Sequence, residues 1–126
     1  MRPKTLQEVA QLTIDGDDFD RCLANFLDEF YAQPNAQALL PEPKLLAPRL
    51  GDPGQVQDAY LAATAEQLAC AYGFSVAAWA ASEDRKLRRP WFASPLAALR
   101  AVLLLESPVA FRSRNLFISE NALTRA

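Results

Sequence analysis

The pattern of apolar and polar positions along the chain predicts helices joined by short loops. In one stretch the apolar residues are three or four positions apart, which is the spacing of one face of an α-helix. This stretch contains Phe19, Leu23, Phe26, Leu27 and Phe30. It predicts an amphipathic helix that is capped by Asp17 or Asp18 and ends at Pro34.

Two other places have the residues that start a helix. Thr5 and Glu8 form a capping box, in which each side chain hydrogen-bonds the backbone N–H of the other residue. Asp52 at the cap and Pro53 in the first turn start a longer helix, which we expect to end at Gly73.

The most apolar helix is expected from Leu96 to Leu105, opened by Ser94 and Pro95. Apolar side chains cover most of its circumference, which is typical of a helix surrounded by others. We therefore predict an all-α, single-domain irregular bundle of five to six helices around this central apolar helix. The single domain comprises residues 1–126.

Residues 34–54 break the helical pattern, because prolines alternate there with leucines. Proline blocks long helices, whereas the leucines favour burial. We expect an ordered segment that crosses the core, with one helical turn at Asn35–Leu40.

Composition supports a helical globular protein: 51% of the 126 residues are hydrophobic, 22% are charged, and alanine and leucine make up a third. The net charge of −2 is unevenly distributed. Residues 1–63 contain 5 Lys or Arg against 10 Asp or Glu, and residues 64–126 contain 8 against 5. The second half is therefore the more basic one.

The residue types argue against several classes of function. The chain has no histidine, and its two cysteines, Cys22 and Cys70, are far apart, which favours reduced, packed thiols over a disulfide or a metal site. The acidic residues at 15–20 lack the register of a calcium-binding loop and suit a helix N-terminus. There is no glycine-rich nucleotide-binding loop, so we expect no enzyme activity, cofactor or metal. The N-terminus lacks the apolar core of a signal peptide and no apolar run is long enough to span a membrane, which predicts a cytoplasmic protein.

A cluster of basic and aromatic residues is the strongest candidate for a functional surface. It consists of Arg85, Lys86, Arg88, Arg89, Trp91 and Phe92. Arginine and tryptophan are favoured at protein interfaces, whereas cations beside aromatic rings also suit a nucleic acid. A third interpretation is a solvated loop with both aromatic rings in the core. Arg112 and Arg114, in the C-terminal segment, extend the candidate surface.

Residues 66–79 are compatible with a helix-turn-helix around Gly73. The second helix, however, has no Arg, Lys, Asn or Gln to contact bases.

The second half of the chain resembles a family of small bacterial proteins. The resemblance covers residues 73–79, Arg89-Pro90-Trp91-Phe92, residues 106–117 and residues 121–126. The family has no established activity, and the resemblance implies a partner protein, as for antitoxins that accompany nucleotidyltransferase-like toxins. It assigns no role to any residue.

Together these observations predict a non-catalytic protein-interaction module, either antitoxin-like or a homo-oligomeric regulator. The alternative is a nucleic-acid-binding protein that uses the loop from Arg85 to Arg89.

Overall fold

The computed structural model describes residues 2–94 and 97–125. These residues form helices α1 (Leu6–Ile14), α2 (Phe19–Ala32), α3 (Ala47–Leu50), α4 (Asp52–Tyr72), α5 (Ala97–Glu106) and α6 (Val109–Arg112). Three short 3-10 helices, η1 (Ala36–Ala38), η2 (Ala78–Ala81) and η3 (Glu83–Arg85), and two strands, β1 (Trp91–Phe92) and β2 (Leu116–Phe117), complete the described elements. The prediction of a small, mostly helical fold is confirmed.

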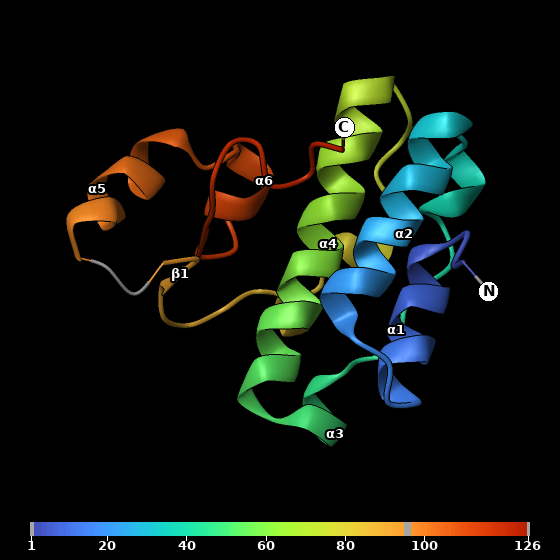
Figure 1. Cartoon of the computed structure of the whole chain (residues 1–126), viewed down its shortest axis with the longest axis horizontal. Helices are drawn as coiled ribbons and strands as arrows, with labels where there is room; N and C mark the ends of the chain where they lie inside the picture. Colours follow the sequence, from blue (N-terminus) through green and yellow to red (C-terminus); the bar gives the residue numbers. More distant parts are fainter. Residues whose placement is uncertain (1, 95–96, 126) are drawn as a thin grey trace.

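Helix α4 is the central element. In Figure 1 it lies between α2 on one side and the C-terminal segment with α6 on the other. Five of its alanines, at positions 59, 62, 63, 65 and 69, are at most 1% exposed. Their small side chains let neighbouring elements pack closely on several sides of the helix.

The helix that the sequence places at the centre is instead at one end of the molecule. Helix α5 lies at the opposite end of the long axis from α1 (Figure 1). Its Leu103 is 7% exposed, whereas Leu105 is 84% exposed. The prediction was wrong because an apolar pattern shows what a helix can bury, and not which neighbours surround it. Pro95 and Leu96, expected to open this helix, lie outside the described residues.

Most helix ends follow the predicted chemistry. The Thr5 hydroxyl accepts a hydrogen bond from the Glu8 N–H at 3.1 Å, as predicted, whereas the Glu8 carboxylate accepts from the Lys4 N–H at 2.9 Å and not from the Thr5 N–H. The Asp18 carboxylate caps α2 by accepting from the Arg21 N–H at 2.9 Å. Helix α4 ends at Gly73 with φ = 72°, as predicted.

The start of α4 differs by one residue from the prediction. Asp52 lies inside the first turn, and the capping residue is Gly51 with φ = 68°. Glycine adopts this left-handed conformation without the steric cost of a Cβ.

The proline-rich segment crosses the core, as predicted; we call residues 34–51 the strap. Leu39 and Leu46 of the strap are buried, and the indole N–H of Trp79 donates to the Leu40 carbonyl at 3.2 Å. The strap lies so close to α4 that a Cβ on Gly54 would be 2.6 Å from the Leu46 carbonyl oxygen. Only glycine fits this position without a shift of the backbone.

The segment after α4 contains less helix than expected. After Gly73, where the sequence is compatible with the second helix of a helix-turn-helix, the chain forms the 3-10 turn η2. This turn is too short to act as the second helix of a helix-turn-helix. Strands β1 and β2 form a two-residue parallel sheet, with Trp91 opposite Leu116 and Phe92 opposite Phe117. Strands of two residues are too short to give a recognisable alternation of apolar and polar residues in the sequence.

Candidate functional site

Arg85, expected on an exposed basic loop, is inside the protein. Its side chain is 1% exposed, and its Nη2 donates to the Pro43 carbonyl at 2.5 Å. Its guanidinium carbon is 4.8 Å from the centre of the Trp79 ring. The prediction that Arg85 contacts a partner is therefore corrected: its charge holds the strap.

Asp58 on α4 supplies the negative charge for Arg85, with 4.0 Å between Oδ1 and Nη1. The Asp58 carboxylate is completely buried and accepts from the Leu46 N–H at 2.7 Å and the Ala47 N–H at 3.0 Å. Burial raises the pKa of Asp58, and burial lowers the pKa of Arg85. Because the carboxylate already accepts two backbone amides at the start of α3, the pair is a structural clamp.

Arg114 is also buried, contrary to its place among the candidate partner-binding residues. It is 3% exposed, and its Nη1 donates to the Ala110 carbonyl at 2.6 Å. Its Nη2 donates to the Ala80 carbonyl at 2.8 Å and to Glu66 Oε1 at 2.9 Å. Arg114 therefore joins α6, η2 and α4, and it is not available to a partner.

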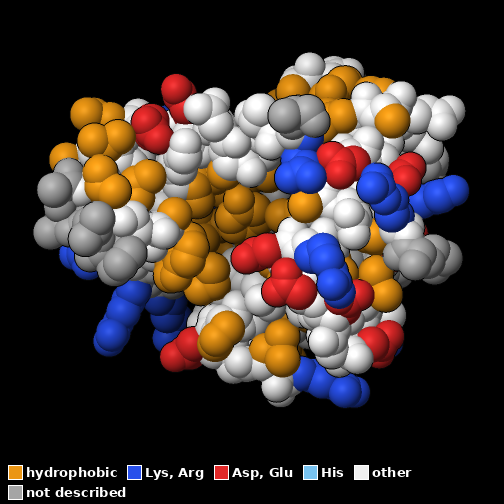
Figure 2. Space-filling model, viewed as in Figure 1, with side chains coloured by type: hydrophobic (Ala, Val, Ile, Leu, Met, Phe, Trp, Pro, Cys, Tyr) orange, Lys and Arg blue, Asp and Glu red, His pale blue; other side chains and the backbone are white. Residues whose placement is uncertain are grey.

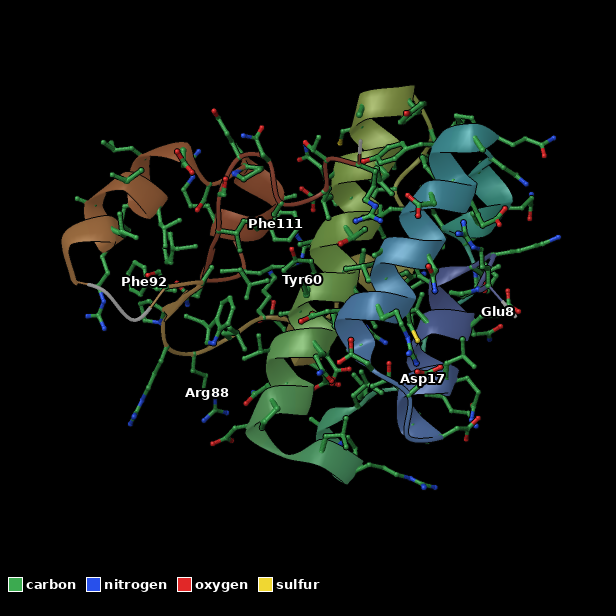
Figure 3. The ribbon with its side chains drawn as sticks, in the orientation of Figure 1. Glu8, Asp17, Tyr60, Arg88, Phe92 and Phe111 are labelled. Carbon is green, nitrogen blue, oxygen red and sulfur yellow. The ribbon has the colours of Figure 1, made fainter. Side chains whose placement is uncertain are left out.

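Three of the predicted cations are exposed: Arg88, Arg89 and Arg112. None of them has an ion pair with another residue in the described part of the chain. Figure 3 shows Arg88 extending away from its loop. Lys86 is half-buried and pairs with Glu83 at 3.1 Å.

The two-strand sheet sets the positions of Trp91 and Phe92, the two residues of β1. The Trp91 N–H donates to the Asn115 carbonyl at 2.8 Å, and the Trp91 side chain is 36% exposed. Phe92 is half-buried and stacks on Phe117 with 5.0 Å between ring centres. The interpretation with both rings in the core is therefore wrong for Trp91.

Trp91 borders two adjoining hollows of about 390 and 450 Å³. Both hollows are also lined by Tyr60 of α4, so together they form one groove, which we call the Tyr60 groove. Its other large apolar lining residues are Phe19, Leu23, Leu27, Pro53, Val56 and Ile118, and Ala24, Ala93 and Ala122 also line it. Figure 2 shows an apolar depression between the α5 end of the molecule and the helices.

Charged residues flank the groove. Asp20 and Asp52 line it on the α2 and α4 side, and Arg125 lines it at the C-terminal end. Arg125 is held by Asp28, with 2.9 Å between Nε and Oδ1. Burial raises the pKa of Tyr60 to about 12, so the phenol is neutral at physiological pH.

The groove could not be foreseen from the sequence. Leu23 and Leu27 belong to the α2 stripe and Tyr60 to α4, and helical periodicity does not show which residues from other segments lie beside them. The groove exists because residues 91–93 and 118–125 lie against these helices from far away in the sequence.

A separate hollow of about 650 Å³, lined by both polar and apolar residues, lies beside the buried clamp. Its polar lining residues are Gln55, Asp58, Glu83, Asp84, Lys86 and Arg88. Asp58 is already hydrogen-bonded to two backbone amides, and Lys86 is paired with Glu83. Asp58 and Lys86 are therefore engaged in contacts within the protein.

Within residues 2–94 and 97–125, no group of three His, Cys, Asp or Glu residues could hold a metal ion. Cys22 is buried, whereas Cys70 is exposed, so the expectation of two packed thiols is wrong for Cys70. In the acidic cluster, Asp18 caps α2 and Asp17 pairs with Arg21. Hydrogen bonds from the Asp18 backbone and the Arg21 side chain lower the pKa of Asp17.

No helix in the described part of the chain has the length and hydropathy needed to cross a membrane. Comparison with family models, with curated proteins and with solved structures finds no match to this chain.

Proposed function

We propose that this chain is a non-catalytic protein-interaction module of the cytoplasm, either antitoxin-like or a homo-oligomeric regulator. The observation that carries the proposal is the exposed pair Arg88 and Arg89 beside Trp91, in a hollow that shares Asp52, Val56 and Trp91 with the Tyr60 groove. Arginine, tryptophan and tyrosine are the residues most enriched where binding energy is concentrated in protein interfaces.

The surface combines two features that protein partners use. The groove supplies apolar contact area, and the exposed guanidinium groups at its edge can form charge-assisted hydrogen bonds with carboxylates. Burial of Arg85 and Arg114 limits the surface to Lys86, Arg88, Arg89, Trp91, Phe92 and Arg112.

The experiment compares proteins retained by the tagged wild type with those retained by Arg88→Glu combined with Arg89→Glu. The matched control is Lys44→Glu combined with Arg49→Glu, which reverses two exposed charges of the strap. We expect one protein to bind the wild type and the control and to be lost from the Arg88/Arg89 variant. Equal retention by all three proteins would refute the proposed surface.

A nucleic-acid-binding function is a second candidate, favoured by the exposed Trp91 beside Arg88 and Arg89. Aromatic rings stack on unpaired bases, and arginines bind phosphates. Retention on single-stranded DNA or RNA should then fall steeply as salt rises, because phosphate contacts release counterions. If the chain shows no retention at low salt, this candidate is rejected.

A further inference from the structure

Helix α5 exposes large apolar side chains that nothing in the described part of the chain covers. Leu99, Val102, Leu104 and Leu105 of α5 are 43, 47, 45 and 84% exposed, and Val109 at the start of α6 is 65% exposed. Leu99, Val102 and Leu105 recur every three positions and so lie along one side of α5, and exposed apolar surfaces of this kind mark interaction sites in folded proteins.

The internal packing of α5 is slight. Leu103 is its buried large side chain, and the guanidinium carbon of Arg100 lies 5.1 Å from the centre of the Phe92 ring. A helix of 10 residues is marginal in water without an apolar face to bury. Contact between the exposed face and a partner would therefore stabilise the helix itself.

The same chain contains a concave apolar surface of matching chemistry, the Tyr60 groove. Figure 2 shows both the apolar depression and apolar side chains over α5 on the face that is viewed. Val102 and Leu105 are three positions apart, so they lie on one side of α5, as in helices that bind in grooves. The exposed side of α5 is a convex apolar surface, and the Tyr60 groove is a concave one.

We propose that a second copy of this chain occupies the groove: α5 of each copy packs into the Tyr60 groove of the other. Because both surfaces lie on one face, a single two-fold axis between them generates both contacts at once. The inference rests on the proposed function, since it identifies the first partner of the interaction module.

The contact area and the charges of the chain favour a second copy, and not an unrelated protein, as the occupant of the groove. A stable dimer buries about 800 Å² on each partner, which one short helix alone does not provide. The reciprocal arrangement doubles the contact, because each copy contributes both α5 and a groove. The small net charge of −2 adds little repulsion between copies, and Arg100 of α5 is opposite in charge to Asp20 and Asp52, which line the groove.

The test measures the mass of the purified protein by sedimentation equilibrium over a range of concentrations. We expect a dimer at about 100 µM, since interfaces of this size have dissociation constants of micromolar or below. Amide exchange in residues 97–106 should slow as the dimer forms. A wild type that stays monomeric throughout would overturn the inference.

Two single substitutions separate the two surfaces. Leu105→Glu changes α5 at a side chain with little contact in the monomer, and Ala122→Arg changes an exposed residue that lines the groove. Each should raise the dimer dissociation constant by about 100-fold, because a two-fold interface contains every change twice. Val76→Glu, at an exposed residue that does not line the groove, is the control and should leave the dimer unchanged.

Mixing the Leu105→Glu and Ala122→Arg variants gives the decisive outcome. A mixed dimer has one unchanged contact, and its other contact places the introduced carboxylate against the introduced guanidinium. It should therefore be more stable than the dimer of either variant alone. A dimer that survives Ala122→Arg would instead mean that α5 pairs with α5 and would overturn the groove contact.

The result is independent of the proposed function's own experiment. If the wild type is a monomer but another protein binds through Arg88 and Arg89, the interaction module stands and this inference fails. If the dimer forms and no other protein depends on Arg88 and Arg89, the inference stands and the heterologous partner is rejected.

Discussion

At the scale of single residues, Asp58 has the most consequential contacts. Its carboxylate accepts two backbone amides of the strap and neutralises Arg85, which in turn donates to Pro43. Buried charges are tolerated only where such contacts replace water. The clamp explains why an arginine in a run of basic residues lies inside the protein.

Replacing Asp58 by alanine should lower the free energy of unfolding by about 3–5 kcal/mol, since Arg85 would remain buried without a counter-charge. Urea denaturation followed by circular dichroism measures this loss. Asp52→Ala, at an exposed position in the first turn of the same helix, is the control and should cost less than about 1 kcal/mol. Equal losses from the two substitutions would contradict the clamp.

Tyr60 should make stability depend on pH in the alkaline range. Its pKa is raised to about 12 in the folded protein by burial, against about 10 in an unfolded chain. Between these values the folded state holds the proton more tightly, so the free energy of unfolding falls as pH rises, by up to about 3 kcal/mol.

Tyrosinate absorbance, titrated against pH, would measure this shift. Tyr60→Phe should remove the ionisation near pH 12 and flatten the pH dependence of unfolding above about pH 10. Loss of an ionisation near pH 10 instead would show that the groove leaves this phenol in water.

At the scale of elements, the contact between the strap and α4 depends on one missing side chain. Alanine normally stabilises a helix relative to glycine by about 1 kcal/mol. Gly54→Ala should nevertheless lower the free energy of unfolding by about 2 kcal/mol, because the added Cβ would lie 2.6 Å from the backbone oxygen of Leu46.

Denaturant unfolding checks this sign, with Gly73→Ala as the comparison. Gly73 has φ = 72° and nothing within 4 Å of an added Cβ, so its substitution should cost only the backbone strain, about 1–2 kcal/mol. A gain in stability for Gly54→Ala would mean that the strap lies further from α4.

The leucines of α5 differ in burial, since Leu103 is buried and Leu105 is exposed. Leu103→Ala should lower the free energy of unfolding by about 2–3 kcal/mol, whereas Leu105→Ala should change it by less than about 0.5 kcal/mol in the monomer. Thermal unfolding at low protein concentration measures both. Equal effects would show that α5 is packed on both sides, as the sequence pattern alone suggested.

At the scale of the whole molecule, Arg114 joins the second half of the chain to α4. It hydrogen-bonds Ala80 and Ala110 and pairs with Glu66. Strand β2 follows directly and pairs with β1, so the same segment also positions Trp91 at the groove. The contacts of Arg114 therefore help to hold the segment that positions Trp91 at the groove.

Substitution of Arg114 by alanine should lower the free energy of unfolding by about 2–4 kcal/mol, because buried carbonyls and Glu66 lose their donor. Amide exchange should show the largest loss of protection in residues 107–118. Arg112→Ala, two positions away and exposed, serves as the control and should have an effect below about 0.5 kcal/mol. Similar exchange in both variants would contradict a joining role for Arg114.

The sequence by itself determined much of the local structure, although not the cap of α4 or the 3-10 turn that follows Gly73. The caps at Thr5 and Asp18, the αL glycine at Gly73, the α2 stripe and the strap were all predicted correctly. These features depend on neighbouring residues and on backbone preferences that act within a few positions.

Only the tertiary structure decided which helix is central, which arginines are buried and where the groove lies. Arg85 and Arg88 are three positions apart and have the same chemistry, yet Arg85 is buried because Asp58, Pro43 and Trp79 meet around it. Leu105 belongs to the most apolar run of the chain but lies at an edge. Burial is a property of contacts between distant segments, and the local pattern of a sequence does not contain those contacts.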